Sequence, residues 1–140
     1  MTTPTVAQTQ VIIDWITSLG WDTSQELGYP LFPGPQILSE PDRSVWITGS
    51  GGPGYVTDEG SADASSFQVR VRGTTDDVFG PEIAAAQLDF LILKAPMPVK
   101  VDGVPIQSVG RTGSGPSPLP VDPNDNRHEF TASYIIVTGA

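Results

Sequence analysis

The sequence has no cysteine, a single histidine and few basic residues. Without cysteine, the chain can form neither disulfides nor thiolate zinc sites, and it has no cysteine nucleophile. No apolar run approaches the ~20 residues of a membrane-spanning helix, and even Phe90–Leu93 is far too short. Met1–Gln10 carries no Lys or Arg, which argues against a secretory signal peptide. We therefore expect a protein that is made in the cytoplasm and does not enter a membrane.

Positive charge is scarce as well. Seven Lys and Arg residues stand against sixteen Asp and Glu residues, which gives a net charge of -9. Proteins that grip nucleic acid depend on Lys and Arg to neutralise phosphates. The charge therefore argues against sequence-specific binding of nucleic acid. It suits simple solubility, or a surface past which DNA must move without adhering.

The length of 140 residues and the 38% of hydrophobic residues are sufficient for one domain that spans residues 1–140. Two helices are expected. The first extends from about Pro4 to Leu19, with an apolar stripe at helical spacing: Ile12, Trp15, Ile16 and Leu19. The second extends from Pro81, a favourable first helical residue, to Lys94. Its apolar face comprises Ile83, Ala84, Leu88, Leu91 and Ile92, and Asp89 marks its polar side.

The clearest strand is Phe67–Arg72, where apolar and polar residues alternate strictly and Gly73 is expected to end the strand. The other expected strands are Ser44–Thr48, a hairpin over Pro98–Val109 that turns at Asp102-Gly103, and Glu129–Thr138. Long flexible loops are expected near residues 49–66 and 110–126, which are rich in Gly and Ser. The order of elements predicts an α+β fold, with an antiparallel or mixed sheet of about four to five strands and two main helices packed on one side.

Several patterns imitate ligand-binding loops. Gly49–Gly54 spells G-x-G-x-x-G after a strand, but no helical stripe and no Lys-Ser/Thr pair follows, so a loop is favoured over a phosphate site. Asp122–Asn126 starts like a calcium loop, yet its sixth position is Arg127 and its twelfth is Ser133. A turn is the better interpretation. The carboxylates within Asp58–Asp63 fit a solvated loop better than a cation site. We expect no metal and no cofactor.

Catalysis finds little support. His128 stands beside Glu129 and could form half of a general-base pair, but no G-x-S-x-G motif supplies a nucleophile. No catalytic residue is therefore expected, and a hydrolase that uses His128 with a nearby Ser ranks low. A small-ligand or carbohydrate-binding module is an alternative of another class, with Trp21, Trp46 and Tyr55 as an aromatic platform.

The polar face of the strand Phe67–Arg72 is a candidate subunit interface. It presents Gln68, Arg70 and Arg72, whose guanidinium groups could pair with carboxylates of a neighbouring subunit. A solvated sheet face explains these residues about as well. The acidic pair Asp76-Asp77 suits the start of a helix or a negative rim. The candidate interface residues are Gln68, Arg70, Arg72, Asp76, Asp77 and Arg127.

Two segments carry a resemblance to a known family. The strand Phe67–Gly73 is followed by an acidic turn and an Ala-rich helix that ends in Leu91-Ile92-Leu93, and Arg127–Tyr134 has the form R-H-E-F-T-x-x-Y. Both segments resemble the tail terminator (minor tail or minor capsid) proteins of long-tailed bacteriophages. The resemblance covers Ser66–Lys94 and Arg127–Val137.

The resemblance implies a tail-terminator-like α+β subunit of the virion neck. Such subunits form a homo-oligomeric ring, usually a hexamer, that caps the tail tube protein and offers a docking surface to the head connector protein. DNA would only pass through the lumen. A head-completion or connector protein of the same neck region is an equally compatible alternative. The Pro-rich segment Tyr29–Pro41 and the segment Gly110–Asn126 depart from the family pattern.

Overall fold

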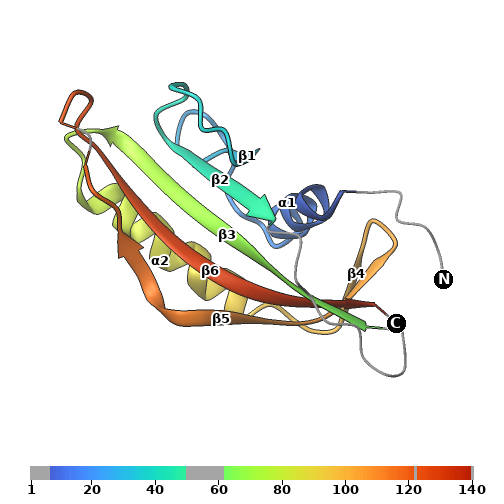
Figure 1. Ribbon diagram of the computed structural model, residues 1–140. Helices are drawn as coiled ribbons and strands as arrows, with labels where there is room; N and C mark the ends of the chain where they lie inside the picture. Colours follow the sequence, from blue (N-terminus) through green and yellow to red (C-terminus); the bar gives the residue numbers. More distant parts are fainter. Residues whose placement is uncertain (1–6, 50–61, 122, 140) are drawn as a thin grey trace.

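A computed structural model describes residues 7–49, 62–121 and 123–139. These residues form two helices and six strands (Figure 1). In chain order the elements are α1 (Gln8–Ser18), β1 (Leu31–Pro33), β2 (Ser44–Gly49), β3 (Ala62–Thr75), α2 (Phe79–Leu93), β4 (Val99–Val101), β5 (Val104–Pro118) and β6 (Arg127–Gly139).

The strands form one mixed sheet in the order β1-β2-β3-β6-β5-β4. Only β1 and β2 run parallel, and every other neighbouring pair is antiparallel. Figure 1 shows the long strands β3 and β6 side by side along a strongly curved sheet, with α2 across the back of it. The predicted α+β class with a mixed sheet and two helices is confirmed. The additional strand is β1, which lies in the Pro-rich segment Tyr29–Pro41, where no strand was expected.

Alternation along the strands places the core on one face of the sheet. Val69 of β3 lies between Ile47 of β2 and Ala132 of β6, and all three side chains are buried. The rings of Phe67 and Tyr134 stack with their centroids 5.1 Å apart. Both helices contribute to this core. The other face, which we call the open face, carries the polar side chains of the same strands.

Helix α1 begins at Gln8, four residues later than predicted, and its predicted start at Pro4 lies outside the described residues. The predicted stripe is confirmed, because Ile12, Trp15 and Ile16 are fully buried. Neither of the described helices is long and apolar enough to cross a membrane.

Helix α2 begins at Phe79, two residues before the predicted start. The carboxylate of Asp77 accepts a hydrogen bond from the backbone N–H of Gly80 at 2.9 Å, and this satisfies one of the free donors of the first turn. Asp77 therefore supports the start of the helix, as one of the two interpretations of the acidic pair predicts. The side of α2 that faces the sheet consists of Ala84, Ala85, Leu88, Asp89 and Ile92.

Two predictions about the faces of α2 are wrong. Ile83, expected in the core, is 54% exposed, and Asp89, expected to be solvated, is 9% exposed. The Asp89 carboxylate accepts hydrogen bonds from the Tyr134 hydroxyl (2.7 Å) and from the Arg111 guanidinium. Burial and the bond to Asp89 raise the pKa of Tyr134. An apolar core can hold this carboxylate because both of its oxygens are bonded.

The predicted loops are too long. Strand β3 already begins at Ala62, and β5 continues to Pro118, so the described part of the second loop is short. Although Gly113–Pro118 has the composition of a loop, β5 pairs with β6 from Ile106 to Pro118, with register shifts on the way. Likewise, β3 does not end at Gly73 but continues to Thr75 across an irregularity.

Gly73 should be intolerant of a side chain. A Cβ atom there would lie 2.7 Å from both Cγ and Cδ of Pro81, in the first turn of α2. We expect Gly73→Ala to lower the free energy of unfolding by about 1–3 kcal/mol through overpacking, as measured by urea denaturation. Gly110→Ala is the matched control, because nothing lies within 4 Å of its Cβ position. Equal stability of the two variants would show that the contact of α2 with β3 is not tight.

Candidate interface on the open face of the sheet

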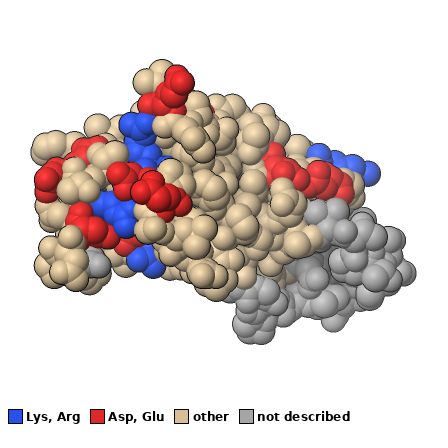
Figure 2. Space-filling model, turned by 90° about the horizontal axis from the view of Figure 1, so that it is seen from above, with Lys and Arg blue, Asp and Glu red and all other residues tan. Residues whose placement is uncertain are grey.

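A groove of about 440 Å³ lies on the open face, at the end where β3 finishes and β6 begins. Figure 2 shows charged side chains of both signs gathered at this end, whereas the middle of the same surface carries few. The groove is lined by Ile37, Arg70, Arg72, Pro120, Val121, Pro123, Asp125, Arg127 and Glu129. The groove thus brings together three of the six candidate interface residues predicted from the sequence: Arg70, Arg72 and Arg127.

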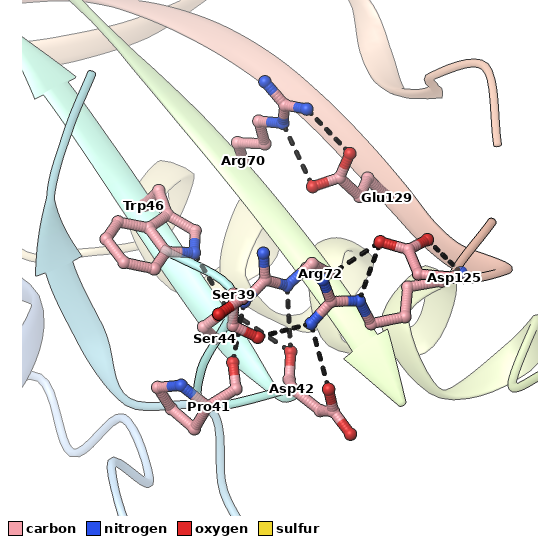
Figure 3. A network of polar contacts seen from close by, with 10 residues as sticks. Ser39, Pro41, Asp42, Ser44, Trp46, Arg70, Arg72, Asp125 and Glu129 are labelled. Carbon is pink, nitrogen blue, oxygen red and sulfur yellow. Dashed lines mark hydrogen bonds and ion pairs between the residues drawn. The ribbon is translucent and has the colours of Figure 1, made fainter. Parts of the chain in front are cut away.

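Arg72 is the most buried of the three arginines, with 4% of its surface exposed. Its guanidinium donates hydrogen bonds to the carbonyl oxygens of Pro41 (2.8 Å) and Asp42 (3.2 Å). The guanidinium carbon also lies 5.9 Å from the ring centroid of Trp46 (Figure 3). Burial, and then the positive charge of Arg127, lower the pKa of Arg72. Arg72 therefore fastens the Pro-rich segment to the sheet.

Trp46 completes this attachment from β2. Its indole N–H donates to the Ser44 hydroxyl at 2.8 Å, and its ring stacks on Phe32 of β1 with centroids 4.8 Å apart. With 3% exposure, Trp46 offers no surface to a ligand. The predicted aromatic platform is therefore wrong with respect to Trp46, and Tyr55 lies outside the described residues.

Arg127 joins three segments. It donates to the Asp125 carboxylate (3.0 and 3.2 Å), to the Asp42 carboxylate (2.9 Å) and to the carbonyl oxygen of Ser39 (2.7 Å). Burial alone would lower the pKa of Arg127, but the bonds to Asp125 and Asp42 outweigh it and raise the pKa. The backbone N–H and the guanidinium of Arg127 in turn lower the pKa of Asp125.

Arg70 is the most accessible of the three. It forms a two-point ion pair with Glu129 of β6, at 2.7 and 3.2 Å, while 39% of its side chain stays exposed. Gln68 is also exposed and lies two residues before Arg70 on the same face. These two residues can contact another chain without a change in the fold.

The other three candidates, Gln68, Asp76 and Asp77, do not line the groove. Asp77 bonds to the first turn of α2, as described above. Asp76 adopts a positive φ of 65° at the end of β3, and its backbone N–H donates to the carbonyl of Asn126 at 3.0 Å. The side-chain amide of Asn126 donates to the carboxylate of Asp76. Asn126 therefore belongs to a structural turn, which supports the choice of a turn over a calcium loop.

Features of a catalytic site are sparse in the part of the chain that the structure covers. No described hydrogen bond or ion pair involves the side chain of His128, and it lines neither of the two described grooves. The described residues contain no cluster of His, Asp or Glu that could hold a metal ion. The second groove, of about 370 Å³, lies between α2 and the segment that follows α1, and includes Trp21, Leu27 and Leu91.

Comparison with known proteins gives no further guidance, because neither a known family model nor a curated protein matches the chain. The function has to be argued from the geometry.

The attachment by Arg72 predicts a difference between two Arg→Lys variants. Arg72→Lys loses the planar group that bonds two carbonyls and covers Trp46, so we expect a loss of about 1–3 kcal/mol in the free energy of unfolding. Arg70→Lys keeps a charge beside Glu129 in a solvated pair and should cost less than ~1 kcal/mol. Urea denaturation of both variants measures the difference. A loss for Arg70→Lys as large as for Arg72→Lys would contradict this assignment.

Proposed function

We propose that the chain is a structural subunit of the neck of a long-tailed bacteriophage. In this role it assembles as a ring on the end of the tail tube and presents a docking surface to the head. The proposal combines the resemblance in Ser66–Lys94 and Arg127–Val137 with what the structure shows about the surface of the subunit.

One observation carries the proposal: large apolar side chains are exposed on both layers of the fold. On the helical layer, Phe79 and Phe90 of α2 are 72% and 66% exposed, and on the open face of the sheet Ile135 is 44% exposed. Extended apolar surface on a soluble subunit usually marks a contact with another protein. A ring of cyclic symmetry needs two different surfaces on each subunit, one for each neighbour, and the two layers supply them.

The arginines give a second line of support. Each arginine of the sequence donates to a group of its own chain: Arg43, Arg70, Arg72, Arg111 and Arg127. Their charges are therefore directed to acidic or carbonyl partners and not to a phosphate backbone. Together with the net charge of -9, this favours a lumen through which DNA slides.

Electron microscopy of the purified chain, alone and after mixing with purified tail tubes, tests the proposal. We expect closed rings of about six subunits that are bound to one end of each tube and stop its elongation. A chain that forms no ring and leaves both ends of the tube free would contradict the proposal. Rings that bind isolated head connectors but do not bind tail tubes would favour a head-completion protein instead.

A substitution on the open face tests the role of the sheet layer. Ile135→Asp should abolish the rings, because a carboxylate would have to be buried in the contact, whereas the fold should tolerate it at a position that is already 44% exposed. Thr17→Asp, on the exposed side of α1, is the control and should leave the rings intact. Intact rings with Ile135→Asp would exclude the open face from the subunit contact.

A further inference from the structure

Helix α2 is apolar on the side that faces away from the sheet. Its exposed apolar residues recur at intervals of four, three, four and three: Phe79, Ile83, Ala86, Phe90 and Leu93. At 3.6 residues per turn they lie within an arc of about 80°. We call this set the α2 stripe. The opposite side, with Leu88 and Ile92, packs on the sheet, so the helix is apolar on two opposite sides.

The α2 stripe has the spacing of a seam between two packed helices. The order of side-chain sizes along the stripe is also nearly the same in both directions, with large side chains at both ends and Ala86 in the middle. Antiparallel pairing with an identical helix places Phe79 opposite Leu93 of the second copy and Ile83 at the height of residue 89 of that copy, one position from its Phe90. Ala86 then meets Ala86 where the helices come closest. We infer that α2 pairs antiparallel with α2 of a second copy, around a two-fold axis at Ala86.

Charges beside the α2 stripe favour the same orientation. In the antiparallel pair, Lys94 lies at the height of residue 78 of the second copy, next to the acidic turn Asp76-Asp77. Parallel pairing would instead place each of these charges beside the identical charge of the second copy. Like charges so placed repel, in a chain that already carries -9.

The area of the α2 stripe sets the strength of the pair. Taking ~200 Å² for a fully exposed large side chain, the stripe offers on the order of 400 Å² per copy. The pair would then bury about 800 Å² in total, below the range of stable interfaces. We therefore expect a reversible pair that dissociates on dilution. The proposed ring would use the same side of α2 for one of its two contacts, so this pair can form only between subunits that are not in a ring. It does not depend on the proposed function.

The absence of cysteine makes a direct test possible, because Ala86→Cys introduces the only thiol of the chain. On the two-fold axis, two such thiols can meet within the Cα separation of about 4.4–6.8 Å that a disulfide spans. We expect Ala86→Cys to form a disulfide-linked dimer under mild oxidation at least tenfold faster than Thr17→Cys. Thr17 is exposed on α1, so it reports random collisions. Non-reducing electrophoresis measures both rates.

A second variant distinguishes pairing from the reactivity of one thiol. Phe90→Asp, added to Ala86→Cys, should reduce cross-linking to the rate of Thr17→Cys, and circular dichroism checks that each variant is folded. The inference is overturned if Ala86→Cys cross-links no faster than Thr17→Cys, or if Phe90→Asp leaves its rate unchanged. Rings on tail tubes without this cross-link would leave the proposed function standing and exclude the pair. Cross-linking without rings would support the pair and contradict the proposed function.

Discussion

The constraint on which the rest depends is that α2 has two apolar sides while the sheet can cover only one. Asp89 decides which side is covered. It lies at the edge of the buried side, where it binds Tyr134 of β6 and Arg111 of β5. Rotation of the helix would separate the carboxylate from these partners, and a buried charge without a partner is strongly destabilising. The orientation of α2 is therefore fixed, and Phe79 and Phe90 must point away from the sheet.

A second set of polar contacts keeps the open face in one shape. Arg72 and Arg127 fasten the segment around Asp42 to β3 and β6 on the open face of the sheet. Arg70 and Glu129 join the same two strands beside them. These arginines contribute to the cohesion of the subunit itself. A surface held in this way would change little on contact with a neighbour, which would reduce the entropic cost of the proposed assembly.

The sequence predicts those elements whose signal lies in their own residues. The alternation in Phe67–Arg72 and the Asp102-Gly103 turn, with φ values of 52° and 78°, are examples. It predicts β1 and the later part of β5 poorly, because both depend on main-chain bonds to a neighbouring strand and not on side-chain preference. The faces of α2 were ambiguous for a related reason. A helix that is apolar all round has no stripe that distinguishes the covered side from the exposed one.

The candidate interface shows the same division. Alternation correctly placed Arg70 and Arg72 on one face, and Arg127 joins them through the pairing of β3 with β6. Their partners could not be found in this way, since Asp42 is 85 residues from Arg127 and approaches only when the Pro-rich segment folds over the sheet. Alternation also could not predict that Trp46 is buried on the open face, beneath Arg72.

We infer that a single copy of this chain is an incomplete unit, because its apolar surface needs a second copy. The molar mass of the unaltered protein, measured by light scattering over a dilution series, tests this most directly. We expect a mass that is a multiple of 14.8 kDa at high concentration and falls towards this value on dilution. A mass of 14.8 kDa at every concentration, with α2 still folded, would contradict it.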